Sequence, residues 1–193
     1  MFAANAVRNL LNMETQNQYQ TIVKQLQKTL DIKNPMAVPK ITKIVVNMGV
    51  KDAVADKKNI ERMSKAMAII TGQKPKVARA KKAIATFKLR EGDPIGLVVT
   101  LRGRRMHQFY ERLVAIVLPR IRDFRGVKRT SFDAKGNYSL GFHEYSVFPE
   151  IDPATVDKLQ GFEIIFVTTA KDHKEGIALF ESMGMPFVKE QKR

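Results

Sequence analysis

The stretch TGQKPKVARAKKAIATFKLR, residues 71–90, has the clearest capacity for chemistry in this sequence. It carries seven Lys or Arg and no acidic residue, yet the apolar residues Val77, Ile84 and Phe87 recur within it. Lysine makes point contacts with phosphates, whereas the planar guanidinium of arginine can bind a phosphate through two hydrogen bonds or stack on an exposed base. The stretch therefore predicts a phosphate-binding hairpin, which the three apolar residues anchor on a folded domain.

Basic residues continue beyond this stretch, in LRGRR and PRIRDFRGVKR. Residues 62–129 hold eighteen Lys or Arg and four acids, whereas the rest of the 193-residue chain holds sixteen and fifteen. A local excess of this size repels itself, and a polyanionic partner relieves that repulsion. We therefore expect a nucleic acid, and structured RNA before duplex DNA, with an anionic membrane surface or plain solubility as alternatives. The candidate cations are Lys74, Lys76, Arg79, Lys81 and Lys82 in the hairpin, and Arg102, Arg104, Arg125, Lys128 and Arg129 beyond it.

Catalytic and cofactor-binding patterns are weak in this sequence. His107, His143 and His173 are scattered, and none is part of a paired metal-binding motif. HEYSVFPEID gathers acidic residues, so a metal-dependent nuclease using Glu150 and Asp152 remains an alternative. The sequence has no cysteine, and no glycine-rich phosphate loop is present. We therefore expect no catalytic site, no metal, no cofactor and no small-molecule substrate.

The spacing of apolar residues predicts the elements that must position these side chains. Residues spaced by three and four predict helices at 19–30, 56–72, 106–118 and 172–184, with Asp56 as a cap, Gly72 as an end and Pro119 as a stop. In the third helix Phe109, Leu113, Ile116 and Val117 are expected to point inward, and the methionines of the second helix are expected in the core. Short β-branched runs predict strands at 41–48, 76–80, 84–89, 97–103 and 162–169, whereas 126–142 is expected to be a loop with a turn at Gly136.

These elements mix helices and strands without strict alternation, which favours an α+β fold. We expect a mainly antiparallel, mixed sheet with helices packed largely on one face, and a protruding basic hairpin. Residues 1–18 are interpreted as a flexible N-terminal extension, and residues 19–193 as a single RNA-binding domain. No apolar run approaches the length of a membrane span, so no membrane partner is expected.

Several separate blocks resemble one known family. ITKIVVNMGV, ITGQKPKVARAKKAIATFKLREGDPIGLVVTLRG, LPRIRDFRGV, SFDAKGNYSLGF and FPEID resemble, in order and spacing, the bacterial type of the large-subunit ribosomal protein five family. This is the family that binds 5S ribosomal RNA in the central protuberance. The resemblance covers residues 19–188. It implies a structural constituent of the large subunit, located in the cytoplasmic ribosome, and no enzyme.

The resemblance also implies roles for particular residues. It assigns 5S ribosomal RNA binding to Asn47, Gln73 and Thr100, which the residues alone would suggest to be a strand-end cap, a helix-end residue and a strand filler. The basic hairpin resembles the loop that contacts transfer RNA in the P site, and residues 123–138 resemble a segment that faces the small-subunit head in an intersubunit bridge. The implied partners are 5S ribosomal RNA, large-subunit ribosomal RNA, P-site transfer RNA, neighbouring 5S-binding ribosomal proteins and a small-subunit head protein. A freestanding RNA-binding protein is the alternative closest to this function.

Overall fold

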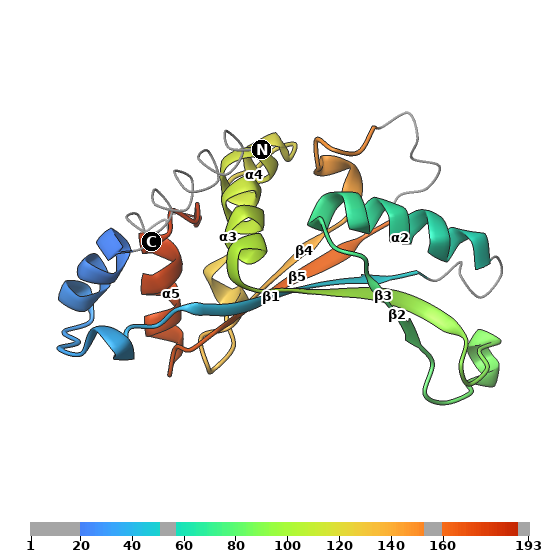
Figure 1. Cartoon of the computed structure of the whole chain (residues 1–193), viewed down its shortest axis with the longest axis horizontal. Coiled ribbons are helices and arrows are strands. Elements are labelled where there is room, and N and C mark those ends of the chain that lie inside the picture. Colours follow the sequence, from blue (N-terminus) through green and yellow to red (C-terminus); the bar gives the residue numbers. More distant parts are fainter. Residues whose placement is uncertain (1–19, 51–56, 153–159, 189–193) are drawn as a thin grey trace, which may run out of the picture.

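The computed structural model describes residues 20–50, 57–152 and 160–188 of the chain. The expected extension, residues 1–18, lies outside these ranges, as does Asp56, the expected helix cap. Within them the chain forms a five-stranded sheet and a set of helices (Figure 1). The α+β fold expected from the sequence is confirmed.

The sheet is built from strands that pair antiparallel with each of their neighbours. The strands are β1 (Ile41–Gly49), β2 (Lys76–Arg79), β3 (Pro94–Leu101), β4 (Tyr138–Phe142) and β5 (Phe162–Thr168), in the spatial order β2-β3-β1-β5-β4. The strands expected at 41–48, 76–80 and 162–169 agree with β1, β2 and β5 to within one residue. β1 is therefore the central strand, and β2 and β4 form the two edges.

Side chains along the strands alternate between a buried and an accessible face, as a period of two requires. In β1 the side chains of Ile44, Val46 and Met48 are fully buried, whereas Asn47 between them is exposed. One face of the sheet is therefore apolar. The opposite side is called the open face here, and on the three central strands it carries Lys43, Val45, Asn47, Val98, Thr100, Glu163 and Ile165.

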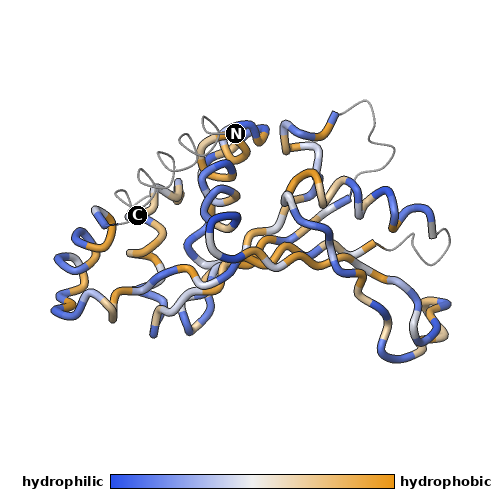
Figure 2. Tube along the Cα trace, in the orientation of Figure 1, coloured by the Kyte–Doolittle hydropathy of each residue, from blue (hydrophilic) through white to orange (hydrophobic). Residues whose placement is uncertain are grey.

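Helices cover the apolar face of the sheet. α2 (Lys57–Thr71), α3 (Gly103–Arg112) and α5 (His173–Ser182) lie on this side, and the strands beneath them are the most hydrophobic part of the trace (Figures 1 and 2). From α3 the ring of Tyr110 lies 5.9 Å from Phe166 of β5 and 6.2 Å from Phe180 of α5. Met67 of α2 is buried in the same core, together with Leu26 of the helix formed by residues 20–29. The expected packing of helices on one face is confirmed.

The helix expected at 106–118 is longer and less regular than its sequence suggests. α3 passes into a π-helical turn, η4 (Leu113–Val117), and then into α4 (Leu118–Arg120). Pro119 does not close the helix at its own position: it follows the π-helical turn, and the helix ends one residue later, at Arg120. The wider turn also changes the phase of the helix. Phe109, Leu113 and Val117 are buried as expected, but Ile116 is 45% exposed, so its inward placement was wrong.

Residues 84–89 were expected to be a strand and form a tight turn instead. A 3-10 turn, η3 (Ala85–Phe87), lies between Ile84 and Leu89, which form an isolated bridge. Lys88 adopts a left-handed conformation with φ of +52°, which reverses the chain. The following strand, β3, begins at Pro94, three residues earlier than expected. Together β2, β3 and this turn form the protruding hairpin seen away from the helices in Figure 1.

Residues 138–142, expected to belong to a loop, form the edge strand β4. Its sequence YSLGF includes Ser139 and Gly141, which carry little β-propensity, and the strand is only five residues long. Pairing with β5 supplies the stability that the local sequence does not indicate. The turn expected at Gly136 is present, with φ of +69°.

Candidate nucleic-acid interface

Asn47 and Thr100 lie on the same face of the sheet. Asn47 of β1 pairs with Val98 of β3, and Val45 pairs with Thr100. Paired residues in an antiparallel sheet point to the same side, so Asn47 and Thr100 are diagonal neighbours, at roughly 7–8 Å between backbones. Asn47 is exposed and Thr100 is half-buried. The fold therefore brings two of the three expected neutral RNA contacts together on the open face.

Gln73 joins this pair from the end of α2. Gly72 ends that helix in a left-handed conformation with φ of +67°, as the sequence indicates. The Thr71 hydroxyl donates to the carbonyl oxygen of Met67 at 2.7 Å and lies 3.0 Å from that of Gln73, which fixes the exit of the chain. The Gln73 side-chain amide then donates to the carbonyl oxygen of Thr100 at 3.4 Å. All three neutral residues therefore gather at one corner of the sheet.

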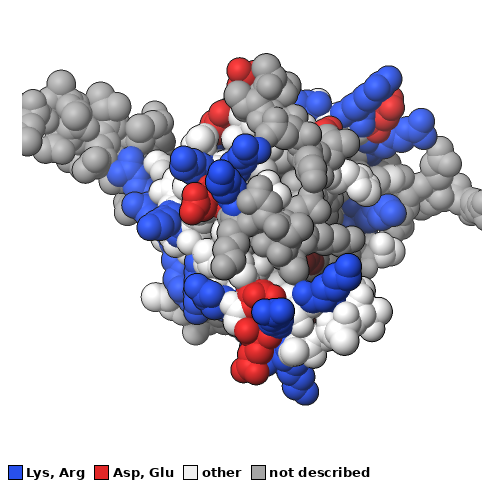
Figure 3. Space-filling model, turned by 90° about the vertical axis from the view of Figure 1, so that its right-hand side faces the viewer, with Lys and Arg blue, Asp and Glu red and all other residues white. Residues whose placement is uncertain are grey.

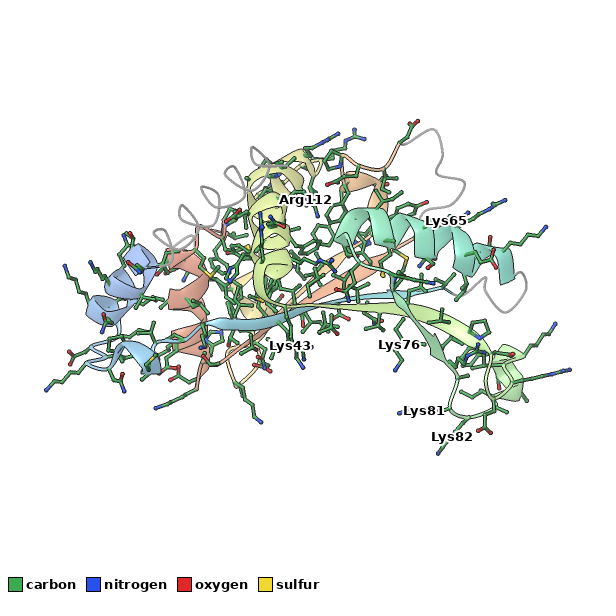
Figure 4. All side chains as sticks on the ribbon, in the orientation of Figure 1. Lys43, Lys65, Lys76, Lys81, Lys82 and Arg112 are labelled. Atoms are coloured by element: carbon green, nitrogen blue, oxygen red, sulfur yellow. The ribbon has the colours of Figure 1, made fainter. Side chains whose placement is uncertain are left out.

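The register of the sheet extends this corner into a continuous row. Lys76, Val98, Asn47, Glu163 and Gly141 are paired in succession across all five strands. A second row runs through Thr100, Val45, Ile165 and Ser139. Lys43 and Lys76 project from this side, away from α2 and α3 (Figure 4). The open face thus offers amide, hydroxyl and short aliphatic groups, with one carboxylate, that of Glu163, and the cations Lys43 and Lys76. Neutral polar groups of this kind suit bases and riboses, and the cations suit phosphates.

The hairpin holds its cations on an ordered turn. The hairpin tip is defined here as residues 80–93, and its base is closed by hydrogen bonds from the Ala80 amide to the Asp93 carbonyl at 2.8 Å and from the Gly92 amide to the Ala80 carbonyl at 2.9 Å. The Arg79 guanidinium donates to the Gly92 carbonyl at 3.0 Å. Residues 81–88 are all exposed, and Lys81 and Lys82 project from the tip (Figure 4). Figure 3, a view onto this end of the molecule, shows Lys and Arg spread across the surface, with acidic side chains interspersed among them.

The apolar residues of the hairpin do not all anchor it, as the sequence led us to expect. Val77 packs against the core, but Ile84 is 43% exposed and Phe87 is 72% exposed. Both lie beyond the closing pair at Ala80, where the chain has left the body of the sheet. The pairing between β2 and β3 therefore holds the hairpin in place, and the tip presents an aromatic side chain to solvent.

The second group of candidate cations lies elsewhere on the molecule. Arg102 and Arg104 are exposed at the start of α3, and Arg125 and Lys128 are exposed after α4. Arg129 differs, because its guanidinium pairs with Glu181 of α5 and lies 5.5 Å from the centre of the Phe187 ring. Glu181 therefore neutralises part of the Arg129 charge, and the ion pair links residue 129 to α5.

A groove beside the edge strand β4 was not expected from the sequence. It has a volume of about 700 Å³ and lies between residues 118–128 and residues 138–147. Arg120, Arg122 and His143 are on its wall, with Phe124 and Leu140. No signal in the sequence joins these residues, because the groove depends on a strand whose local sequence resembles a loop.

Residues 128–138, within the segment expected to face the small subunit, are ordered by local hydrogen bonds. Asp133 accepts from the side-chain amide of Asn137 at 2.7 Å and from two backbone amides, and the Asn137 hydrogen bond in particular lowers the pKa of its carboxyl group. The Tyr138 hydroxyl donates to the Lys128 carbonyl at 3.0 Å. Burial raises the pKa of this phenol to about 12. The segment therefore presents its cations from a defined backbone.

Glu150, one of the acidic residues considered for a nuclease, forms an ion pair within the fold. Arg112 of α3 pairs with Glu150 at 2.7 Å and also donates to the Ile70 carbonyl at 2.6 Å. In Figure 4 Arg112 lies between α3 and α2, on the helical side of the sheet. Across the described residues, no group of three or more His, Asp or Glu could hold a metal ion. Glu150 therefore joins structural elements rather than a metal centre.

Comparisons with known sequences agree with this architecture. The sequence model described as ribosomal protein L5 matches residues 34–90, and the model for the C-terminus of the same ribosomal family matches residues 94–187. The protein called large ribosomal subunit protein uL5 from Roseiflexus castenholzii is 52% identical over 170 residues, which cover 88% of this chain and 94% of the relative. The chain belongs to the ribosomal protein L5 family. Proteins of the same name from Mesoplasma florum and Acaryochloris marina are 53% and 52% identical, over 87% and 86% of this chain and 93% and 92% of those relatives.

Membership confirms the broad function expected from the sequence. The chain is a structural constituent of the large ribosomal subunit, associated with the ribosome and its RNA, and its family is not enzymatic. The expected location in the cytoplasmic ribosome is confirmed by the same relatives. This assignment is favoured over both a freestanding RNA-binding protein and a nuclease. In the described part of the chain, no helix is long and apolar enough to cross a membrane.

Proposed function

We propose that this chain binds 5S ribosomal RNA through the open face of its sheet, with Asn47, Gln73 and Thr100 as neutral contacts. The observation that carries the proposal is that Asn47 and Thr100 share this face, on the side of the sheet opposite α2, α3 and α5, while the Gln73 amide reaches the Thr100 carbonyl at the same corner of the sheet. An amide can both donate and accept hydrogen bonds with a base edge or a ribose hydroxyl. Lys43 and Lys76, which project from the same face, supply attraction to nearby phosphates.

The hairpin tip is proposed to contact P-site transfer RNA. The candidate cations are Lys81 and Lys82 in the tip, together with Lys74, Lys76 and Arg79 in the part of the hairpin that leads to it. The tip projects beyond the body of the sheet (Figure 1), so a second RNA can be reached while the open face is occupied. A hydrogen-bonded turn holds these cations at less entropic cost on binding than a disordered tail would.

The remaining cations are proposed to serve the wider assembly. Arg102 and Arg104 are candidates for contacts with large-subunit ribosomal RNA. Arg125, Lys128 and Arg129 belong to the segment proposed to meet a small-subunit head protein in an intersubunit bridge. Arg129 contributes there mainly by fixing the backbone, because Glu181 already neutralises part of its charge. Neighbouring 5S-binding ribosomal proteins complete the proposed partners, and no cofactor is required.

The test is a titration of a transcribed 5S ribosomal RNA with the parent chain and with Asn47→Ala and Gln73→Ala. Each variant is expected to bind more weakly by about 1–3 kcal/mol, because partners on the RNA are left unpaired in a dried interface. The matched control is Gln108→Ala, which removes an exposed side-chain amide from α3, on the other side of the sheet. Unchanged affinity in both variants would refute the proposed 5S site.

A further inference from the structure

Phe87 is exposed in a way that no other described phenylalanine is. The phenylalanines of the described ranges are buried or half-buried, apart from Phe87, which is 72% exposed at the end of the hairpin. Ile84 beside it in the turn is 43% exposed. A large apolar ring exposed on a protruding tip does not stabilise the fold, because it buries little apolar surface. An intermolecular contact would explain its position.

The backbone beneath the ring is ordered. Ile84 and Leu89 exchange hydrogen bonds of 2.9 and 3.1 Å, which close the turn that carries Phe87. The Lys88 amide donates to the Ala85 carbonyl at 2.9 Å, and Lys88 itself adopts φ of +52°. A left-handed conformation costs a lysine about 1–2 kcal/mol. The turn therefore holds a strained residue next to the exposed ring, as functional surfaces often do.

The charge around the ring distinguishes between partners. Arg79, Lys81, Lys82, Lys88 and Arg90 surround Phe87 in the sequence, and no acidic residue occurs from 79 to 90. The nearest acids, Glu91 and Asp93, lie at the base of the tip: Glu91 is exposed, and Asp93 accepts a hydrogen bond from the Arg90 amide at 2.8 Å. A protein partner would have to match five cations with acids around an apolar pocket. A nucleic acid has both features already, because phosphates flank the flat apolar faces of its bases.

We propose that Phe87 stacks on an exposed nucleobase of the RNA that the hairpin tip contacts, while the cations around it hold the adjacent phosphates. The proposal rests on the transfer RNA contact proposed above and adds a component to it that does not depend on charge. Stacking tolerates any base, because every base has a π-face. The tip would thus recognise an unpaired or stack-terminating base, rather than a regular duplex whose bases are covered.

The chain has no tryptophan, which permits a direct test. Phe87→Trp places a single indole at the tip, and its fluorescence is followed as transcribed transfer RNA is added at low salt. We expect quenching with the RNA and none with inorganic polyphosphate, which binds cations but has no base. The matched reporter is Ile69→Trp on α2, 55% exposed and outside the hairpin, and we expect no quenching there.

Affinity measurements complete the test. Phe87→Ala is expected to weaken binding of transfer RNA about 5- to 150-fold, the range found for loss of one aromatic–base stack, with an unchanged salt dependence. Phe87→Tyr should bind like the parent, and both variants should keep the parent melting temperature because Phe87 lies outside the core. Parent-like affinity of Phe87→Ala, or equal quenching by polyphosphate, overturns the inference. A separate variant, in which Arg79, Lys81 and Lys82 are neutralised, tests the transfer RNA contact itself. If Phe87→Ala binds like the parent but this variant binds transfer RNA more weakly, only the stacking proposal is refuted. If neither variant weakens binding, the stacking proposal and the proposed transfer RNA contact are both refuted.

Discussion

A Cβ atom on Gly176 would lie only 2.8 Å from the Cα atom of Gly136. Gly176 lies in α5, and Gly136 lies in the turn that precedes β4, so the two segments touch backbone to backbone. The Gly136 carbonyl also accepts a hydrogen bond from the Thr168 hydroxyl at 3.0 Å. This contact fixes the turn of the proposed bridge segment against the helical layer.

We predict that Gly176→Ala destabilises the chain by about 1–3 kcal/mol, because the new methyl group meets backbone that cannot rotate away. Helix propensity alone predicts the opposite effect, because alanine stabilises a helix interior by about 1 kcal/mol relative to glycine. A loss of stability would therefore report the backbone contact with Gly136. Lys174→Ala, at an exposed position of the same helix, is the control and should change stability little. Urea unfolding curves measure both. A variant more stable than the parent would show that the turn is not held against α5.

A second prediction concerns Arg112 and Glu150. Replacing Arg112 with Met keeps the volume but removes the ion pair and the hydrogen bond to the Ile70 carbonyl, so we expect a loss of about 1–3 kcal/mol in the free energy of unfolding. Glu150→Gln should cost less, about 1 kcal/mol, because an amide can still accept from the guanidinium. Thermal melts check both values. Full stability of Arg112→Met would mean that the pair contributes nothing.

Much of this architecture is readable from the sequence because local and tertiary preferences agree. The β-branched run of β1 and the methionine stripe of α2 are apolar at the period of their own element, and both form the core. Gly72 ends its helix for a local reason, its left-handed backbone. Such segments can be predicted from their own residues.

The remaining features depend on partners distant in the sequence. β4 is a strand because β5 pairs with it, and the groove beside it exists only once that pairing forms. Pro119 is tolerated because a π-helical turn precedes it. The exposure of Phe87 could not be predicted, since an apolar residue in a short run looks the same whether it enters the core or leaves it. The meeting of Gln73 with Thr100 likewise required the register of the sheet.

A third prediction follows from the buried phenol of Tyr138. Its pKa is raised from 10.0 to about 12 by burial, so the unfolded chain loses this proton at a lower pH than the folded chain does. The contribution of Tyr138 to stability is therefore complete below pH 10 and is lost as pH rises towards 12, by at most about 1.4 kcal/mol per pH unit. Tyr138→Phe should be less stable near neutral pH, through loss of the hydrogen bond to Lys128, but should lose stability less steeply above pH 10. Parallel profiles for the two chains in urea unfolding from pH 8 to 11.5 would contradict this assignment.

The last prediction separates the hairpin tip from the open face. Changing Arg79, Lys81 and Lys82 together to Gln removes three positive charges from the tip and its base, and leaves Asn47, Gln73 and Thr100 intact. We expect most of the affinity for isolated 5S ribosomal RNA to remain. Occupancy of the P site by transfer RNA on reconstituted ribosomes should fall, with a deficit that grows as the salt concentration falls, because the missing contacts are with phosphates.

The salt dependence makes this prediction quantitative. If all three side chains contact phosphates, the slope of log affinity against log salt for transfer RNA should decrease by about 2 to 3 units, whereas the slope for 5S ribosomal RNA should hardly change. A melting curve serves as the control, because Arg79, Lys81 and Lys82 are all exposed and the variant loses only the exposed hydrogen bond from Arg79 to Gly92, so it should unfold nearly like the parent. An equal loss of affinity for both RNAs would place the tip within the 5S interface. Unchanged affinity for both RNAs would show that these cations are solvated and contact neither RNA. The proposal that the tip binds transfer RNA while the open face binds 5S ribosomal RNA would then be wrong.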